Sequence, residues 1–202
     1  MSVMSGPSTT TLVTRVQNIL LRPAAEWDVI AAEPASVGGL YTGYACVLAA
    51  IPAIASIVAS LLFLHFAVIF AVVTAVLSYV LALVGVYVIA FIVDALAPSF
   101  GGEKNQIQAL KLVIYGYTAA WVAGIAGIIP ILGALVALAG GIYSLYTLYI
   151  GMPKLMKCPA DKTLGYFIVT IIVAVVVYAV IGAVVGAVAL MAAGGAMMAA
   201  VH

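Results

Sequence analysis

The chain has 202 residues, which is enough for one domain. Hydrophobic residues make up 67% of it and charged residues only 6%, whereas about a quarter of the residues in a soluble domain are charged. So few polar side chains could not cover a surface in water, and the composition therefore indicates an integral membrane protein. The net charge of +1 and the two cysteines exclude a disordered chain, a disulfide scaffold and a basic nucleic-acid-binding protein.

Residues 1–37 are expected to form an amphipathic N-terminal segment, without the long apolar stretch of a signal peptide ahead of its charges. Apolar side chains recur at helical spacing from Leu12 to Leu20, with polar residues elsewhere on the helical wheel. This pattern predicts an interfacial amphipathic helix whose apolar side lies in the lipid headgroups.

A second short helix is expected to begin at Pro23, carry Trp27 and end at Glu33. Two interpretations of the N-terminal segment follow from its pattern. The segment could be an anchor that fixes the angle at which the first span enters the bilayer. It could instead be a surface on which another protein docks.

Residues 38–93 contain no Asp, Glu, Lys or Arg. A helix needs about 20 residues to cross a bilayer core of about 30 Å, so this stretch predicts two crossings with a reversal between them. We place the turn at His65, which gives spans at residues 39–63 and 67–93.

Two polar breaks divide the rest of the chain into three further spans. The first break follows Asp94, and the second lies within residues 151–163. Between them Pro130 restarts a helix, because proline suits the first helical turn and disfavours helix at the residue before it. The expected spans are residues 112–128, 131–150 and 164–190, and the tail is residues 192–202. The predicted fold is all-α: a polytopic bundle of five transmembrane helices over residues 38–191, preceded by the amphipathic helix.

The charges fix an expected orientation. With five spans, the N-terminal segment and the two polar breaks share one side, and together they hold all 7 Lys and Arg and all 6 Asp and Glu. Because cytoplasmic loops carry the excess of Lys and Arg, we expect the N-terminus in the cytoplasm and the C-terminus outside. Spans 112–128 and 131–150 are short and joined by an apolar turn, so a re-entrant pair is the alternative to two full crossings.

Catalytic chemistry has little support in the sequence. The two histidines, His65 and His202, lie on the uncharged side, away from every carboxylate. The sequence has no metal-binding His or Cys motif and no Gly-rich loop with a lysine that could hold phosphate. We therefore expect a protein that is not an enzyme, with no catalytic, metal or cofactor site.

Two residues bear on transport. Pro52, inside the first span, could unwind the backbone to line a substrate site, or it could be a kink that neighbouring helices tolerate. Asp94 lies at the inner end of the second span, where we expect its carboxylate to reach water. No ionisable residue lies near an expected midplane, where ion-coupled carriers usually place one.

Tyrosines gather near the expected cytoplasmic boundary, from Tyr41 to Tyr166, with Tyr117 at the start of the third span. They predict an aromatic belt; for the Tyr143–Tyr149 triplet, a ligand-binding ladder is the alternative.

Small residues recur every fourth position in the last three spans, and we expect this spacing to serve packing within the chain rather than a homodimer face. The repeats are Gly116, Ala120 and Gly124; Gly133, Ala137 and Gly141; and Gly182 and Gly186.

Three motifs together carry a family resemblance. They are Leu21-x-Pro23-x-x-x-Trp27-x-x-Ile30-x-x-Glu33, Leu96-Ala97-Pro98-x-Phe100-Gly101-Gly102, and Tyr143-x-x-Tyr146-x-x-Tyr149-x-Gly151-x-Pro153 followed by Pro159-x-Asp161-Lys162. In this order, over residues 16–185, they resemble prokaryotic Yip1-domain proteins. The resemblance implies a five-helix membrane protein with a cytosolic N-terminus, in the plasma (cell inner) membrane. Eukaryotic Yip1 relatives bind small prenylated GTPases and act in vesicle traffic, but they carry a longer cytosolic N-terminal region.

The leading hypothesis is a non-enzymatic component that binds or organises other membrane components, or serves traffic, through its cytoplasmic face. We expect its partners to be the lipid bilayer and either a membrane protein or a second copy of the chain, and not nucleic acid. The alternative is a transporter or channel for an uncharged or amphiphilic solute, with a cavity among the first, second and fourth spans. The candidate interaction face comprises Trp27, Glu33, Asp94, Glu103, Tyr146 and Asp161.

Overall fold

The structure is a computed structural model that describes residues 9–63 and 68–199, and the elements over these residues are all helices joined by short connections. It contains five helical stretches long and apolar enough to cross a membrane: Val37–Phe63, Ile69–Phe100, Gln106–Ile128, Ile131–Met156 and Ala160–Met191. The predicted all-α bundle of five membrane-spanning helices with a short N-terminal helix is therefore confirmed. The turn expected at His65, and His202 at the C-terminus, lie outside the described residues.

The first two helices precede the bundle, and the spans are built from the rest. The elements are α1 (Thr9–Leu21), α2 (Pro23–Ala32), α3 (Val37–Leu40), the π-helix η1 (Tyr41–Ala45), α4 (Cys46–Phe63), α5 (Val68–Leu96), the 3₁₀ helix η2 (Ala97–Phe100), α6 (Gln106–Gly116), α7 (Thr118–Ala123), the 3₁₀ helix η3 (Gly124–Ile128), α8 (Pro130–Met156) and α9 (Ala160–Ala199). Pro23 and Pro130 open α2 and α8, as expected from their sequence positions. Helix α9 continues to Ala199 through most of the stretch expected as a tail.

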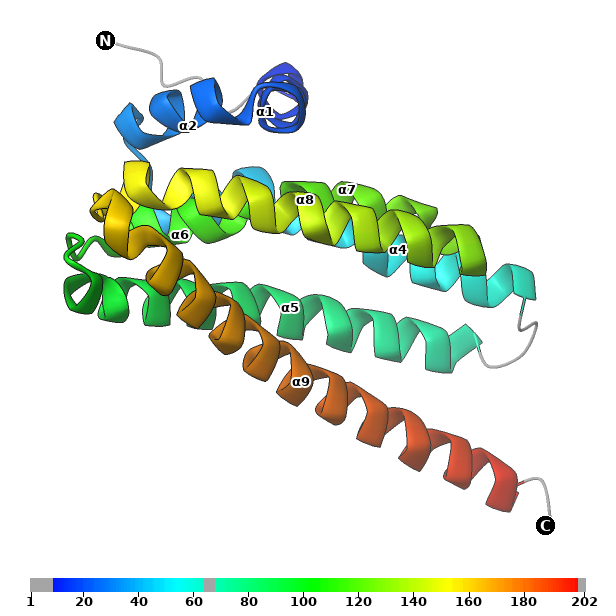
Figure 1. The fold of residues 1–202 in the computed structure, drawn as a ribbon. Coiled ribbons are helices and arrows are strands. Elements are labelled where there is room, and N and C mark those ends of the chain that lie inside the picture. The colour runs from blue at the N-terminus through cyan, green and yellow to red at the C-terminus, as the bar shows by residue number, and fades with distance from the viewer. Residues whose placement is uncertain (1–8, 64–67, 200–202) are drawn as a thin grey trace, which may run out of the picture.

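Helices α4, α5 and α8 run along roughly one direction, and α9 is inclined to them (Figure 1). The polar connections at residues 97–105 and 157–160 lie at the same end of the bundle, and we call this the charged end (Figure 1). The turn between η3 and α8 lies at the opposite end. Helix α9 meets the other helices at the charged end and then diverges from α8 toward its C-terminus (Figure 1).

Helices α1 and α2 lie against one side of the bundle, over α8 and α7 (Figure 1). The apolar side chains of α1 lie partly against the protein core and partly on the surface. Ile19 is buried in the protein core, and Leu12 and Val16 pack against that core, whereas Val13 and Leu21 remain exposed. The helix therefore packs on protein with one part of its apolar surface and offers only the remainder to lipid.

Pro52 lies inside α4, and the helix continues through it to Phe63. The backbone is not unwound there, so the structure favours a tolerated proline over a transporter-like break. Its ring packs against Gly124 at the start of η3, where an added Cβ would lie 2.7 Å from the Pro52 Cβ. Glycine at position 124 allows this close approach of α4 and η3.

Only some of the small residues predicted to serve packing lie at close contacts within the chain. Besides Gly124, Gly133 does so, since an added Cβ there would lie 2.8 Å from the Gly127 Cα. In contrast, a Cβ at Gly141, Gly182 or Gly186 would meet nothing within 4 Å. Packing within the chain therefore explains part of the repeat in α8, and it does not explain the repeat in α9.

Candidate functional site

Trp27, the first of the candidate interaction residues, packs α2 against α8. Its side chain is 1% exposed, and its indole N–H donates to the Thr147 carbonyl oxygen over 2.9 Å. The ring lies directly on Gly151, where an added Cβ would come within 2.5 Å of it. The indole is therefore part of the core and does not belong to the accessible surface.

Four positions on α8 together hold the N-terminal helices, and we call them the docking stripe. Tyr143 donates its hydroxyl to the Leu20 carbonyl at the end of α1, over 2.7 Å. Lys154 donates to the Ala24 carbonyl over 2.6 Å and pairs with Asp28. The docking stripe consists of Tyr143, Thr147, Gly151 and Lys154. Its spacing of four, four and three residues places all four on one face of a helix.

A partly buried ionic cluster ties α1 to α2. Arg15 pairs with Glu26 at 2.5 Å and with both carboxylate oxygens of Glu33 at 2.5 and 2.6 Å. Its guanidinium also lies over the Tyr115 ring, 5.7 Å from the centroid. Burial lowers the pKa of Arg15, but the hydrogen bond and the negative charge of Glu33 raise it more, so the pKa lies above its usual value. The cluster therefore keeps its cation at all physiological pH values.

Lys111 and Gln108 of α6 hold the C-terminal end of α2. Lys111 is 2% exposed, and its ammonium donates to the carbonyl oxygens of Ile30, over 2.8 Å, and of Glu33. Gln108 donates to the Ala31 carbonyl over 2.9 Å. A helix leaves its last carbonyls unpaired, and a cation there also complements the helix dipole. The sequence offered one signal of this role, since Lys111 is the only charged residue in α6.

Asp94 is buried at the charged end, although we expected its carboxylate to reach water. It is 7% exposed, and its Oδ1 has no hydrogen-bond partner among the described residues. Helix α9 covers this end of α5: the Tyr166 hydroxyl donates to the Val93 carbonyl, and the Tyr166 ring stacks on Phe100 with centroids 5.0 Å apart. The residue therefore lies inside the fold and not on the accessible face.

The other candidate residues remain accessible but do not form one cluster. Glu103 and Lys157 form an ion pair of 2.6 Å at the charged end, with both side chains well exposed, and Asp161 is exposed nearby in α9. Tyr146 is exposed on α8, with its ring 5.7 Å from that of Tyr143. Glu33 keeps 43% of its side chain exposed beside the Arg15 cluster. The accessible part of the predicted face thus consists of three acidic residues, at the end of α2 and at the charged end, and of Tyr146 on α8.

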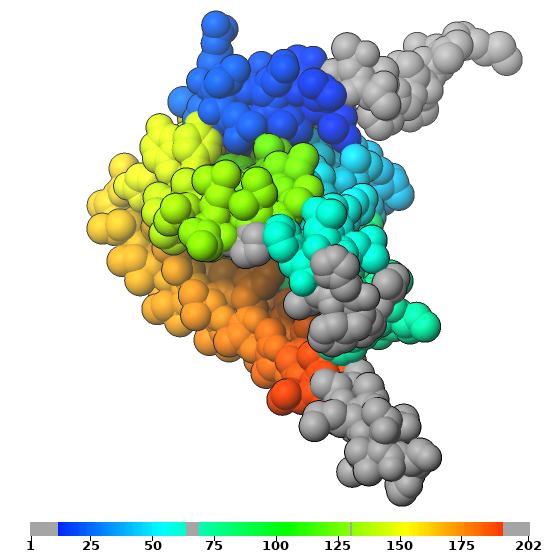
Figure 2. All heavy atoms as spheres, turned by 90° about the vertical axis from the view of Figure 1, so that its right-hand side faces the viewer, coloured from blue at the N-terminus to red at the C-terminus, as the bar shows by residue number. Residues whose placement is uncertain are grey.

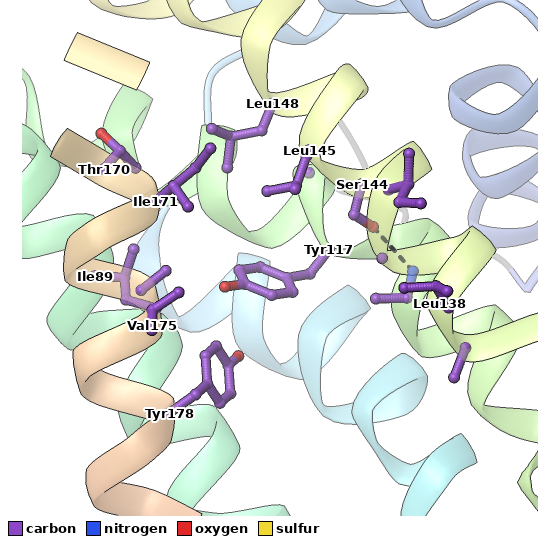
Figure 3. A pocket seen from close by; sticks show the side chains of 16 residues that line it. Ile89, Tyr117, Leu138, Ser144, Leu145, Leu148, Thr170, Ile171, Val175 and Tyr178 are labelled. Atoms are coloured by element: carbon purple, nitrogen blue, oxygen red, sulfur yellow. Dashed lines mark hydrogen bonds between the residues drawn. The ribbon is translucent and has the colours of Figure 1, made fainter. Parts of the chain in front are cut away.

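A pocket of about 430 Å³ lies between α8 and α9, and the sequence did not predict it. Its inner wall comes from α6, α7 and Ile89 of α5 (Figure 3). Tyr117 and Tyr178 point toward one another across it, with centroids 5.8 Å apart (Figure 3). Tyr117 was expected in a belt at the boundary, but it packs inside the bundle because α9 brings Tyr178 against it.

This pocket lies at a different place from the expected transport cavity. We expected a cavity among the first, second and fourth spans, whereas the pocket belongs to the third, fourth and fifth, with Ile89 from the second. The Ser144 hydroxyl accepts the Ala120 backbone N–H over 2.9 Å, and the Thr170 hydroxyl donates to the Tyr166 carbonyl over 2.9 Å. These two hydroxyls therefore bond the backbone, and apart from Tyr117 and Tyr178 the other residues of the lining are glycine or have apolar side chains.

Neither cysteine takes part in a metal or disulfide site among the described residues. Cys46 and Cys158 are both free thiols. Within residues 9–63 and 68–199, no group of three or more His, Cys, Asp or Glu side chains could hold a metal ion. The groups that the structure brings together are therefore those of helix docking and of an apolar pocket.

Five apolar helices and an ionic cluster outside them define an integral, multi-pass helical membrane protein. The family model described as the Yip1 domain matches residues 18–183, which is most of the chain. The chain therefore belongs to the Yip1 family. No curated protein and no solved structure gave a significant match.

Proposed function

We propose that this protein is a non-enzymatic component that binds or organises other membrane components, in a trafficking-related or scaffolding role. The surface that acts is the docked α2 helix together with the charged end of the bundle. The positive-inside rule supports placing this surface in the cytoplasm and the C-terminus outside. The prokaryotic character of the sequence motifs favours the plasma (cell inner) membrane.

The observation that carries the proposal is the rigid attachment of α2. Trp27, Lys111 and Lys154 each join this helix to the bundle by a hydrogen bond, while Val29 remains exposed. A surface that is already ordered loses little conformational entropy when it binds a partner. A simple lipid anchor would not need three separate polar attachments to the bundle.

Photo-crosslinking in native membranes tests the proposal. A photoreactive residue replaces Val29, which is 48% exposed, because a probe at the buried Trp27 would report on the core. The matched control carries the same residue at Ile131, an exposed apolar position at the opposite end of the bundle. We expect a reproducible protein adduct from position 29 and none from position 131. Adducts from position 29 to lipid or to the protein itself alone would contradict the proposal.

The pocket supports a second candidate function, transport of an amphiphilic or uncharged solute. Its lining contains no Asp, Glu, Lys or Arg, which suits a solute without charge. The test is tracer uptake by vesicles that contain the purified protein, compared with empty vesicles. Uptake at equal rates counts against this function for each solute tried.

A further inference from the structure

The α8–α9 pocket exists because small side chains leave its space unfilled. Glycine and alanine occupy the positions on α6, α7, α8 and α9 where larger side chains would meet. Helix α9 also diverges from α8 beyond the charged end, so the two helices do not close over the space (Figure 1). Seen from the end opposite the charged end, a hollow separates α8 from α9 (Figure 2). The small residues that line the pocket are Gly116, Ala120, Ala137, Gly141 and Ala174.

The mouth of the pocket opens sideways, toward the surroundings of the bundle. Leu138, Ile142 and Val175 line the pocket and are also exposed on the surface of the chain. All three lie in membrane-spanning stretches, so the medium that covers them is the bilayer. A molecule can therefore enter from the lipid phase without passing through water.

The depth of the pocket decides which part of a lipid can reach it. Ser144 lies near the middle of α8, a helix of 27 residues, and is therefore well away from both ends of the bundle. A charged or zwitterionic headgroup would lose its hydration at this depth without finding a charged partner in the lining. A hydrocarbon tail pays no such penalty.

We propose that an acyl chain of a membrane phospholipid occupies the α8–α9 pocket. The volume of about 430 Å³ falls within the range of about 300–1,000 Å³ seen for ligand pockets. Water is a poor occupant, because a buried water needs several polar partners and four hydroxyls are the only polar side-chain groups in the lining. Two of these hydroxyls, on Ser144 and Thr170, already bond the backbone. Left empty, the walls would lose dispersion contacts that a tail restores. This inference does not depend on the proposed function of the charged face.

The test uses the full chain in vesicles of phosphatidylethanolamine and phosphatidylglycerol that contain a tracer of phosphatidylethanolamine with a diazirine in mid-chain. Irradiation is followed by mass spectrometry of the protein peptides. We expect adducts concentrated on the Tyr117 and Tyr178 peptides, in excess over the exposed Ile131. Gly141→Leu fills the pocket, where an added Cβ meets nothing within 4 Å, and should abolish this excess. Gly182→Leu is the matched control, because its position is equally open but does not line the pocket.

Several results would overturn the proposal. One is labelling spread evenly over the exposed apolar residues of all five spans, and another is an excess at Tyr117 that Gly141→Leu leaves unchanged. Disulfide crosslinks between copies that carry cysteine at Val175 would show instead that a second copy covers the pocket. If Gly141→Leu fails to fold, Ala174→Leu fills the pocket from α9, and the adduct distribution of the unmodified chain decides independently.

Discussion

Replacing Trp27 with alanine removes the side chain that contributes most to holding α2 on α8. The indole is 1% exposed, and truncation of a buried tryptophan to alanine costs about 3–5 kcal/mol. About 1 kcal/mol of this belongs to the hydrogen bond to the Thr147 carbonyl. The exposed Lys154–Asp28 pair can compensate for little, because such pairs contribute about 0–1 kcal/mol.

The free energy that Trp27→Ala removes belongs to the docking of α1 and α2 and not to the folding of the whole bundle. A cost of about 3–5 kcal/mol shifts the ratio of docked to undocked helix by roughly 10²- to 4 × 10³-fold. Hydrogen exchange of the full chain in nanodiscs measures this shift directly. We expect the amides of α2 to exchange faster in Trp27→Ala by about that factor, while the amides of α5 keep their protection. Trp27→Phe keeps most of the ring, and its α2 exchange should rise only about five- to tenfold.

A double-mutant cycle with Gly151→Ala makes this reasoning refutable. Alone, Gly151→Ala should weaken docking, because its Cβ would lie 2.5 Å from the indole ring. In the Trp27→Ala background the added methyl enters empty space and should cost nothing further. Additive effects of the two substitutions, or α2 protection that Trp27→Ala leaves intact, would show that the indole does not hold the helix in this way.

The remaining predictions concern the other attachments and the course of the chain. Lys111→Met should speed hydrogen exchange at the end of α2, because it removes a buried charged donor and costs about 1–3 kcal/mol of docking free energy. Lys154→Met should cost less than about 1 kcal/mol, because this lysine is more exposed. Equal effects of the two substitutions would contradict the burial argument. Gly124→Val should lower thermal stability, since its side chain must displace the Pro52 ring; an unchanged melting temperature would refute this close packing. A cysteine at Ile129 should react with an impermeant reagent added outside, and persistent protection would favour the re-entrant arrangement.

The sequence predicted the five spans of an all-α bundle because their signal is local. Twenty apolar residues without a charge report directly on the thickness of the bilayer, and Pro130 marks a helix start by its own backbone chemistry. The charges likewise predicted one polar end. None of these inferences depends on which helix packs against which.

The docking of α2 and the pocket depend on contacts between distant parts of the chain. Trp27 bonds the carbonyl of Thr147, 120 residues away, and nothing in its local pattern distinguishes a core indole from an interfacial one. The sequence predicted Tyr117 in the aromatic belt, but in the fold its ring packs against Tyr178 of α9. The regular spacing of small residues indicated where helices approach, but Gly141 faces open space because α9 diverges from α8.

The most direct test of the proposed binding surface compares crosslinking from position 29 in two backgrounds. Val29 carries the photoreactive residue in the otherwise unmodified chain and in Trp27→Ala, both in native membranes. If the docked helix is the binding surface, the protein adduct should form in the first background and disappear in the second. An adduct of equal yield in both would contradict the claim that the partner recognises α2 held on the bundle.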